Sequence, residues 1–148
     1  MTTLNISQNS NTFRIELENN LYAEITFIKN NNSQLLIDGK LFEVSEGEDK
    51  NMLLSDANQT IFTFKLDYLW GGADLISKGT DTGYNIKGRW FKPGTRLIDE
   101  NNKDLVIVKN TNNGYEATVE DDTLDKIMVV STIYYHIYGS KMKQHAPL

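Results

Sequence analysis

Residues 122–139 read DTLDKIMVVSTIYYHIYG, and this stretch decides the fold. Ten of the fifteen residues from Leu124 to Tyr138 are apolar or tyrosine, and the four residues 127–130 (IMVV) are consecutive. At about 100° per residue, such a run covers most of the circumference of a helix, which is typical of a helix buried on all sides. We therefore predict a hydrophobic helix over 122–138 that the rest of the chain encloses. The expected core residues of this helix are Ile127, Met128, Val130, Ile133, Tyr134 and Ile137.

Both ends of the predicted helix carry sequence signals. Asp122 is a suitable N-cap, and Gly139 is suited to the left-handed conformation that ends a helix. Asp121, Asp122 and Asp125 place negative charge at the positive end of the helix dipole. Several β-branched residues make a strand the rival interpretation, but the two end signals favour the helix. The stretch is too short and too often interrupted by polar residues to span a membrane.

The chain before the helix shows the alternating pattern of short half-buried strands, separated by turn residues. The predicted strands cover residues 13–17, 21–27, 34–37, 41–44, 52–54, 62–66, 75–76, 84–90, 96–99, 105–108 and 115–119. Asp38-Gly39 and residues 112–114 (NNG) are strong hairpin signals. The pattern predicts a mainly β (α+β) fold, a closed antiparallel barrel of about 10–12 strands around the helix. A pleckstrin-homology-like barrel capped by the helix is the main alternative.

Length and composition restrict the classes of function. The 148 residues suit one domain, which we place at 12–140 between a flexible N-terminal tail (1–11) and a C-terminal tail (141–148). The net charge of −5 argues against nucleic-acid binding, and the lack of cysteine excludes disulfides, thiolate metal sites and cysteine nucleophiles. The first residues lack the features of a signal peptide, so we expect a cytoplasmic protein. We expect no cofactor and no transmembrane segment.

Four segments carry a resemblance to a known family. They are residues 36–44 (LIDGKLFEV), 53–58 (LLSDAN), 84–91 (YNIKGRWF) and the chain from Tyr115 through the predicted helix. This order resembles the tubby C-terminal-like superfamily, and within it the LURP-one-related branch, which is similar in outline to the phospholipid scramblases. The resemblance implies a twelve-stranded barrel around a central hydrophobic helix. Members range from phosphoinositide-binding regulators to proteins of unknown role, and a shared fold is not an argument for a shared function.

Four basic residues lie within ten positions of one another and form the first candidate site. Lys87 and Arg89 are two residues apart, so they share the strand face opposite Ile86, and Lys92 and Arg96 adjoin the following turn. Arginine can bind a phosphate with two hydrogen bonds, and lysine supplies a point charge. The tubby resemblance makes a phosphoinositide-like head group the relevant ligand. The rival interpretation is a strand face that contacts only water.

Acidic residues before the helix are a second candidate. Glu120, Asp121, Asp122 and Asp125 could hold Ca²⁺ or Mg²⁺, but their spacing is not that of a calcium loop. Helix capping explains the same residues, so we predict no metal site.

His136 lies on the apolar helix, and His145 lies in the tail. Because no nucleophile motif accompanies them, we predict a buried, hydrogen-bonded His136 rather than a catalytic one. Residues 70–72 (WGG) are either a ligand-contacting turn or, as we expect, a bend with a core tryptophan.

These features together predict a non-enzymatic intracellular binding module. It would bind an anionic head group or a protein partner on the barrel exterior, because a central helix fills the interior. Two alternatives remain open. One is a carboxylate- or metal-assisted hydrolase, and the other is a lipocalin-like small-molecule carrier whose helix would lie outside an open barrel.

Overall fold

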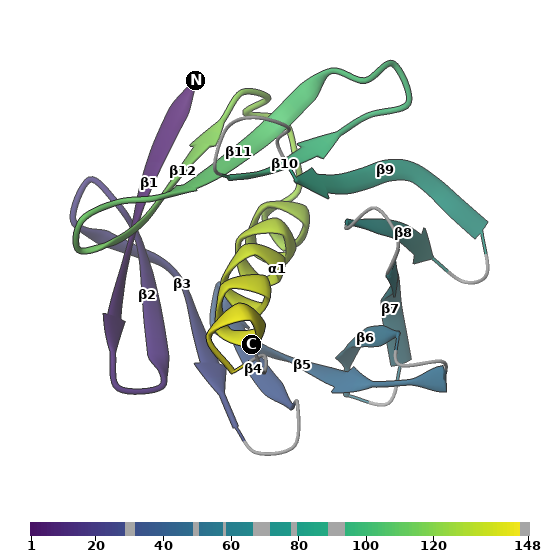
Figure 1. Cartoon of the computed structure of the whole chain (residues 1–148), viewed down its shortest axis with the longest axis horizontal. Coiled ribbons are helices and arrows are strands. Elements are labelled where there is room, and N and C mark those ends of the chain that lie inside the picture. Colours follow the sequence, from purple (N-terminus) through teal and green to yellow (C-terminus); the bar gives the residue numbers. More distant parts are fainter. Residues whose placement is uncertain are drawn as a thin grey trace.

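In the computed structural model of this protein, the described residues form twelve antiparallel strands that close into a barrel, with one α-helix inside it (Figure 1). The structure describes residues 1–28, 32–48, 51–57, 59–66, 72–77, 80–88 and 94–145, without the side chains of 142–145. The elements are β1 (Thr2–Asn9), β2 (Thr12–Leu17), β3 (Asn20–Phe27), β4 (Ser33–Ile37), β5 (Lys40–Glu46), β6 (Met52–Asp56), β7 (Gln59–Leu66), β8 (Ala73–Ser77), β9 (Thr80–Gly88), β10 (Thr95–Ile98), β11 (Asp104–Asn110), β12 (Gly114–Val119) and α1 (Lys126–His145).

Each strand pairs with its neighbour in the sequence, and β1 pairs with β12 to close the ring. The β4–β5 hairpin shows how the sequence directs this meander. Asp38 and Gly39 both have positive φ, 51° and 78°, as the two central residues of a type I′ turn require. The turn pairs Ile37 with Lys40 and so fixes the register of the two strands. The predicted class, a closed antiparallel barrel with a hydrophobic C-terminal helix, is confirmed.

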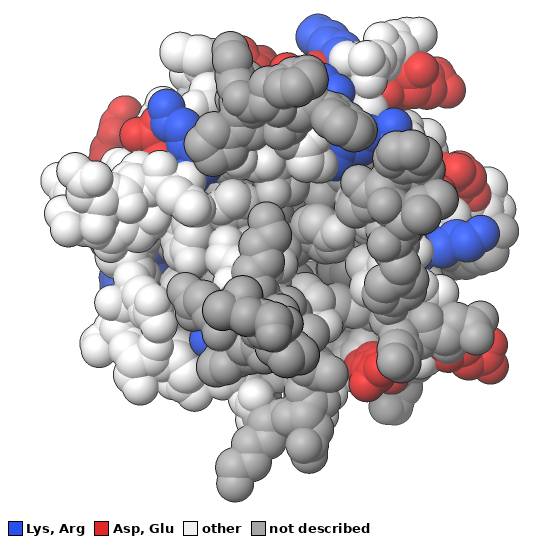
Figure 2. All heavy atoms as spheres, in the orientation of Figure 1, with Lys and Arg blue, Asp and Glu red and all other residues white. Residues whose placement is uncertain are grey.

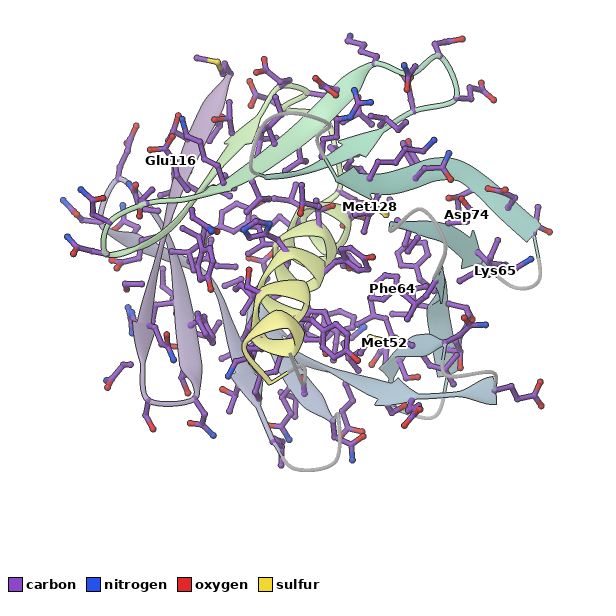
Figure 3. All side chains as sticks on the ribbon, in the orientation of Figure 1. Met52, Phe64, Lys65, Asp74, Glu116 and Met128 are labelled. Atoms are coloured by element: carbon purple, nitrogen blue, oxygen red, sulfur yellow. The ribbon has the colours of Figure 1, made fainter. Side chains whose placement is uncertain are left out.

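Helix α1 passes through the middle of the ring of strands (Figure 1). Its side chains and the inward-facing residues of the strands form one hydrophobic core. Figure 3 shows Met52, Phe64 and Met128 on the inner side, where all three are buried, and Lys65 and Asp74 on the outer side. A helix inside the barrel differs from the pleckstrin-homology-like alternative, in which it caps the barrel, and from the lipocalin-like one, in which it lies outside.

The predicted core residues of the helix differ in their burial. Met128 is 5% exposed, and the other buried members are fully enclosed, namely Val130, Ile133, Tyr134 and Ile137. Ile127 is only partly buried, because it lies in the first turn at the end of the barrel.

The predicted start of the helix is wrong by four residues. The helix begins at Lys126, and the N–H of Ile127 donates to Oδ1 of Asp125 at 2.9 Å, so Asp125 is the N-cap. Asp122 instead accepts a hydrogen bond from the hydroxyl of Thr2 at 2.6 Å. The side chain of Asp121 accepts from the N–H of Thr123 at 3.0 Å, and this local turn delays the start of the helix.

The predicted end of the helix at residue 138 is also wrong. Gly139 lies within α1, which continues to His145. The extra turns have surface to pack against, since the ammonium of Lys141 lies 4.7 Å from the centroid of the Phe27 ring. Part of the predicted C-terminal tail is therefore helical.

The predicted N-terminal tail is a strand. Residues 2–9 form β1, which pairs with β12 on one side and β2 on the other. Leu4 and Ile6 face inward and are buried. The sequence did not predict this strand because its two apolar residues stand among polar ones and give only a weak alternating pattern. Pairing with β12 and β2 forms the strand in spite of that weak local pattern.

Three consecutive helix residues join α1 to different parts of the barrel wall. The hydroxyl of Tyr134 lies 3.2 Å from that of Ser33 in β4, and the hydroxyl of Tyr135 accepts from the N–H of Gly72 at 3.0 Å. The ring nitrogens of His136 bond to β10 and β11. Because successive residues point about 100° apart, these bonds fix the rotation of the helix in the barrel.

Candidate functional site

The outer surface of β9 and β10 holds the part of the predicted basic site that the structure describes. Lys87 is exposed on β9, next to the fully buried Ile86, as strand alternation requires. Arg96 on β10 is the direct cross-strand partner of Lys87. The structure thus brings these two side chains to one face, while Arg89 and Lys92 lie outside the described residues.

Arg96 already has a partner of opposite charge. Its Nη1 lies 3.0 Å from Oδ1 of Asp104 on β11, and its side chain is 25% exposed. This pair reduces the positive charge that Arg96 adds beside Lys87. Figure 2 shows Lys and Arg atoms scattered among Asp and Glu around the rim of one barrel end. Of the two described basic residues of this site, Lys87 is exposed and Arg96 is already paired with Asp104.

The acidic residues before the helix lie in separate local interactions. Hydrogen bonds from the side chain and backbone of Thr123 hold the pKa of Asp121 below its usual range. Hydrogen bonds from Thr2 and the N-terminal ammonium lower the pKa of Asp122 in the same way. Within the described part of the chain, no group of three or more acidic or histidine side chains is placed to hold a metal ion.

His136 is buried and bonded through both ring nitrogens. Its Nε2 lies 2.7 Å from Oδ1 of Asn110, and its Nδ1 lies 2.7 Å from the hydroxyl of Thr95. An amide oxygen can only accept, so Nε2 carries the hydrogen, and in the neutral ring Nδ1 accepts from the hydroxyl of Thr95. This arrangement fixes the ring within the core. His145 is in the last turn of α1, where the structure describes only the backbone.

Residues 70–72 lie mostly outside the described residues, and only Gly72 is placed. Its φ is 104°, and a β-carbon there would collide with the carbonyl oxygen of Ile86 on β9. Only glycine therefore fits this close approach at the start of β8.

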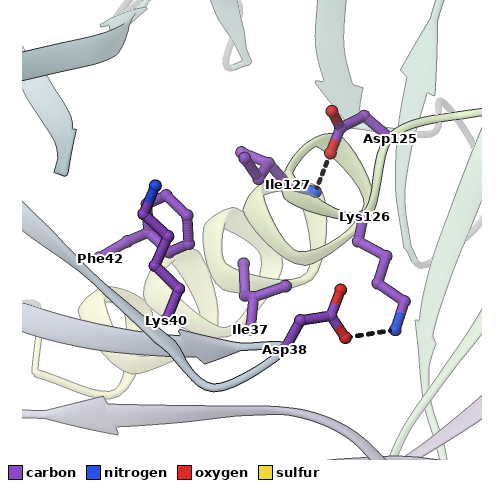
Figure 4. A pocket seen from close by; sticks show the side chains of 7 residues that line it. All are labelled: Ile37, Asp38, Lys40, Phe42, Asp125, Lys126 and Ile127. Atoms are coloured by element: carbon purple, nitrogen blue, oxygen red, sulfur yellow. Dashed lines mark hydrogen bonds and ion pairs between the residues drawn. The ribbon is translucent and has the colours of Figure 1, made fainter.

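A concave site that the sequence did not predict lies between the β4–β5 hairpin and the start of α1 (Figure 4). It has a volume of about 270 Å³, and we call it the hairpin pocket. It is lined by Ile37, Asp38, Lys40, Phe42, Asp125, Lys126 and Ile127. No local motif could have revealed it, because Asp38 and Lys126, which meet there, are 88 positions apart.

Two ion pairs organise the hairpin pocket. Nζ of Lys126 lies 2.8 Å from Oδ1 of Asp38, and Nζ of Lys40 lies 2.6 Å from Oδ2 of Asp56. The Lys126 ammonium also lies 4.5 Å from the centroid of the Tyr22 ring. Burial raises the pKa of Tyr22 to about 12, and the negative charges of Asp38 and Asp125 add to the rise. The helix side of the pocket therefore holds the carboxylates of Asp38 and Asp125 beside the ammonium of Lys126.

The fold places this protein among closed antiparallel barrels with a C-terminal helix in the interior. A solved example is the crystal structure of an Arabidopsis thaliana protein, AT5G01750, which is similar with a TM-score of 0.67 and 13% sequence identity. The similarity covers 95% of this chain and 91% of the Arabidopsis chain. At this identity the likeness shows a common fold and nothing about activity.

No known family model matches this sequence, and no curated protein is significantly similar to it. No helix among the described residues has the length and apolarity needed to cross a membrane.

Proposed function

We propose that this protein is a non-enzymatic binding module that engages an anionic head group through the outer surface of its barrel. The observation that carries the proposal is the position of α1. Ile133, Tyr134 and Ile137 are fully buried inside the ring of strands, so protein side chains pack the interior where a carrier would hold its ligand. A partner then meets the outer strand faces. The tubby-like, LURP-one-related assignment and the cytoplasmic location belong to the same proposal.

The surface we assign to this role is the outer face of β9 and β10. Lys87 and Arg96 are cross-strand partners there, and Arg89 and Lys92 lie between them in the sequence. A basic residue near an anionic bilayer contributes about 1 kcal/mol, so four give roughly 4 kcal/mol at most. That corresponds to a dissociation constant of about 1 mM, and the Arg96–Asp104 pair weakens it further. We therefore expect reversible, salt-sensitive attachment.

Sedimentation with phosphoinositide-containing vesicles tests the proposal. We expect wild type to bind at low salt and to dissociate at moderate salt, and Lys87→Glu/Arg89→Glu to bind at least tenfold more weakly. The matched control is Lys65→Glu/Lys109→Glu, which makes the same change of charge at exposed residues of β7 and β11. Its binding should remain within twofold of wild type.

Two results would overturn the proposal. One is no sedimentation of wild type at low salt, which would leave a protein partner as the class of ligand to seek. The other is equal loss of binding in both double variants, which would show a response to overall charge rather than to the β9–β10 face.

A further inference from the structure

The hairpin pocket combines an apolar floor with charges of both signs. Figure 4 shows Ile37 between Lys40 on one side and the Lys126–Asp38 pair on the other, with Ile127 beside them at the start of the helix. The pocket volume, about 270 Å³, is just below the range of roughly 300–1,000 Å³ that is usual for drug-sized ligands. An occupant must therefore be small.

The charged groups of the pocket retain capacity for further hydrogen bonds. A lysine ammonium has three donors, and the pairs with Asp56 and Asp38 require one donor each from Lys40 and Lys126. A carboxylate has about four acceptor positions, of which the helix cap of Asp125 uses one. An incoming ligand can therefore add bonds to these groups without breaking the existing pairs.

The balance of charge selects the kind of ligand. The lining residues carry two ammonium groups, those of Lys40 and Lys126, and two carboxylates, those of Asp38 and Asp125, so their formal charges cancel. A ligand with only an anionic group leaves the two carboxylates without a partner from the ligand, and one with only a cation leaves the two lysines without one. A ligand with both charges finds a partner for each end.

We propose that the hairpin pocket binds a small zwitterion, with a primary ammonium and an acidic group a few bonds apart beside a short apolar portion. The ammonium lies toward Asp38 and Asp125, which line the pocket beside the start of the helix. The acidic group lies toward Lys40, and the apolar portion contacts Ile37 and Phe42. This site is separate from the β9–β10 face and does not depend on the function proposed there.

This chemistry has two natural sources, a free amino acid and the ethanolamine head group of a membrane lipid. Titrations followed by ¹H–¹⁵N NMR test whether the ligand needs both charges. The probes are L-leucine, which is the zwitterion, leucinamide, which is the cation, and 4-methylpentanoate, which is the anion. We expect leucine to shift the amides of Asp38, Lys40 and Lys126 and to bind at least tenfold more tightly than either analogue. Lys40→Gln should lose the tenfold advantage of leucine over leucinamide, and Asp38→Asn should lose its advantage over 4-methylpentanoate.

The control variant is Lys65→Gln, which removes a lysine on the outer face of β7 and should bind leucine as wild type does. A parallel arm compares neutral vesicles of phosphatidylcholine with and without phosphatidylethanolamine. The choline group lacks N–H donors, so binding only when ethanolamine is present identifies the lipid source. The proposal is overturned if no pocket amide shifts with leucine or with vesicles that contain phosphatidylethanolamine. It is equally overturned if the single-charge analogues bind as tightly as leucine.

Discussion

Tyr134 and Ser33 meet inside the barrel, 101 positions apart in the sequence, with both side chains buried. Removing one hydroxyl leaves the other in the core without this partner, which costs about 1–3 kcal/mol. We expect Tyr134→Phe and Ser33→Ala each to lower the free energy of unfolding by that amount. The double variant should be less destabilised than the sum of the two, because it removes both polar groups.

Urea denaturation of the four proteins measures this coupling. Ser131 supplies the comparison within the same helix. Its buried hydroxyl has no hydrogen-bond partner within the described part of the chain. Ser131→Ala should therefore be neutral or stabilising. Strict additivity of Tyr134→Phe and Ser33→Ala would show that the contact contributes nothing to stability.

Tyr22 makes the free energy of unfolding depend on pH in the alkaline range. Its pKa is about 12 in the folded state, mainly through burial, against about 10 in an unfolded chain. Below about pH 10 the phenol is protonated in both the folded and the unfolded state, so the contribution of Tyr22 to the stability of the fold is fully present. As the pH rises from about 10 to about 12, the unfolded state loses the proton first and stability falls.

Urea titrations at several alkaline pH values check this expectation. Tyr22→Phe should make the loss of stability over this interval shallower. Asp38→Asn should move the ionisation of Tyr22 to lower pH, because it removes one of the charges that oppose it. An unchanged slope in Tyr22→Phe would contradict the assigned pKa.

At the scale of elements, Gly139 distinguishes the observed helix from the predicted one. It lies within α1, and nothing lies within 4 Å of the position that a β-carbon would take. Alanine in a helix interior is more stable than glycine by about 0.5–1 kcal/mol. We expect Gly139→Ala to raise the free energy of unfolding by this amount in thermal or urea denaturation. A helix that ended there in the left-handed conformation would instead be destabilised by the same substitution.

The elements that the sequence predicted are those with strong periodic patterns. The alternation around Phe13 and Ile15 and the Asp38-Gly39 turn predicted strands and a hairpin that the structure contains. The ends of α1 were predicted wrongly because the sequence holds more than one local signal for a helix end. Asp122, the predicted N-cap, is instead bonded to Thr2, and this bond depends on the position of β1. That information is tertiary, and a local pattern cannot supply it.

The same distinction applies to the candidate sites. Strand alternation correctly placed Lys87 outside and Ile86 inside. The bond of Arg96 to Asp104 arises from the pairing of β10 with β11, and the hairpin pocket arises where that hairpin meets a distant helix. Such contacts follow from the three-dimensional register, which residue spacing alone does not fix.

At the scale of the whole molecule, β1 closes the barrel between β12 and β2. Leu4 is fully buried on its inner face, whereas Asn5 is exposed on its outer face. We expect Leu4→Ala to cost about 2–5 kcal/mol of unfolding free energy, as for other buried leucines. Asn5→Ala should change it by no more than about 0.5 kcal/mol. Chemical denaturation measures the unfolding free energy of both variants. Equally small changes in the two would indicate that residues 2–9 are a dispensable tail.

The place of α1 in the chain order has a consequence for synthesis on the ribosome. All twelve strands are translated before the helix that fills the space between them. At about 5–20 residues per second, the twenty residues of α1 take roughly 1–4 s to make. During that time the inner faces of the strands have no helix to cover them, so the nascent chain exposes apolar surface of the kind that chaperones bind. The core of the barrel can therefore be completed only after the helix has followed the strands out of the ribosome.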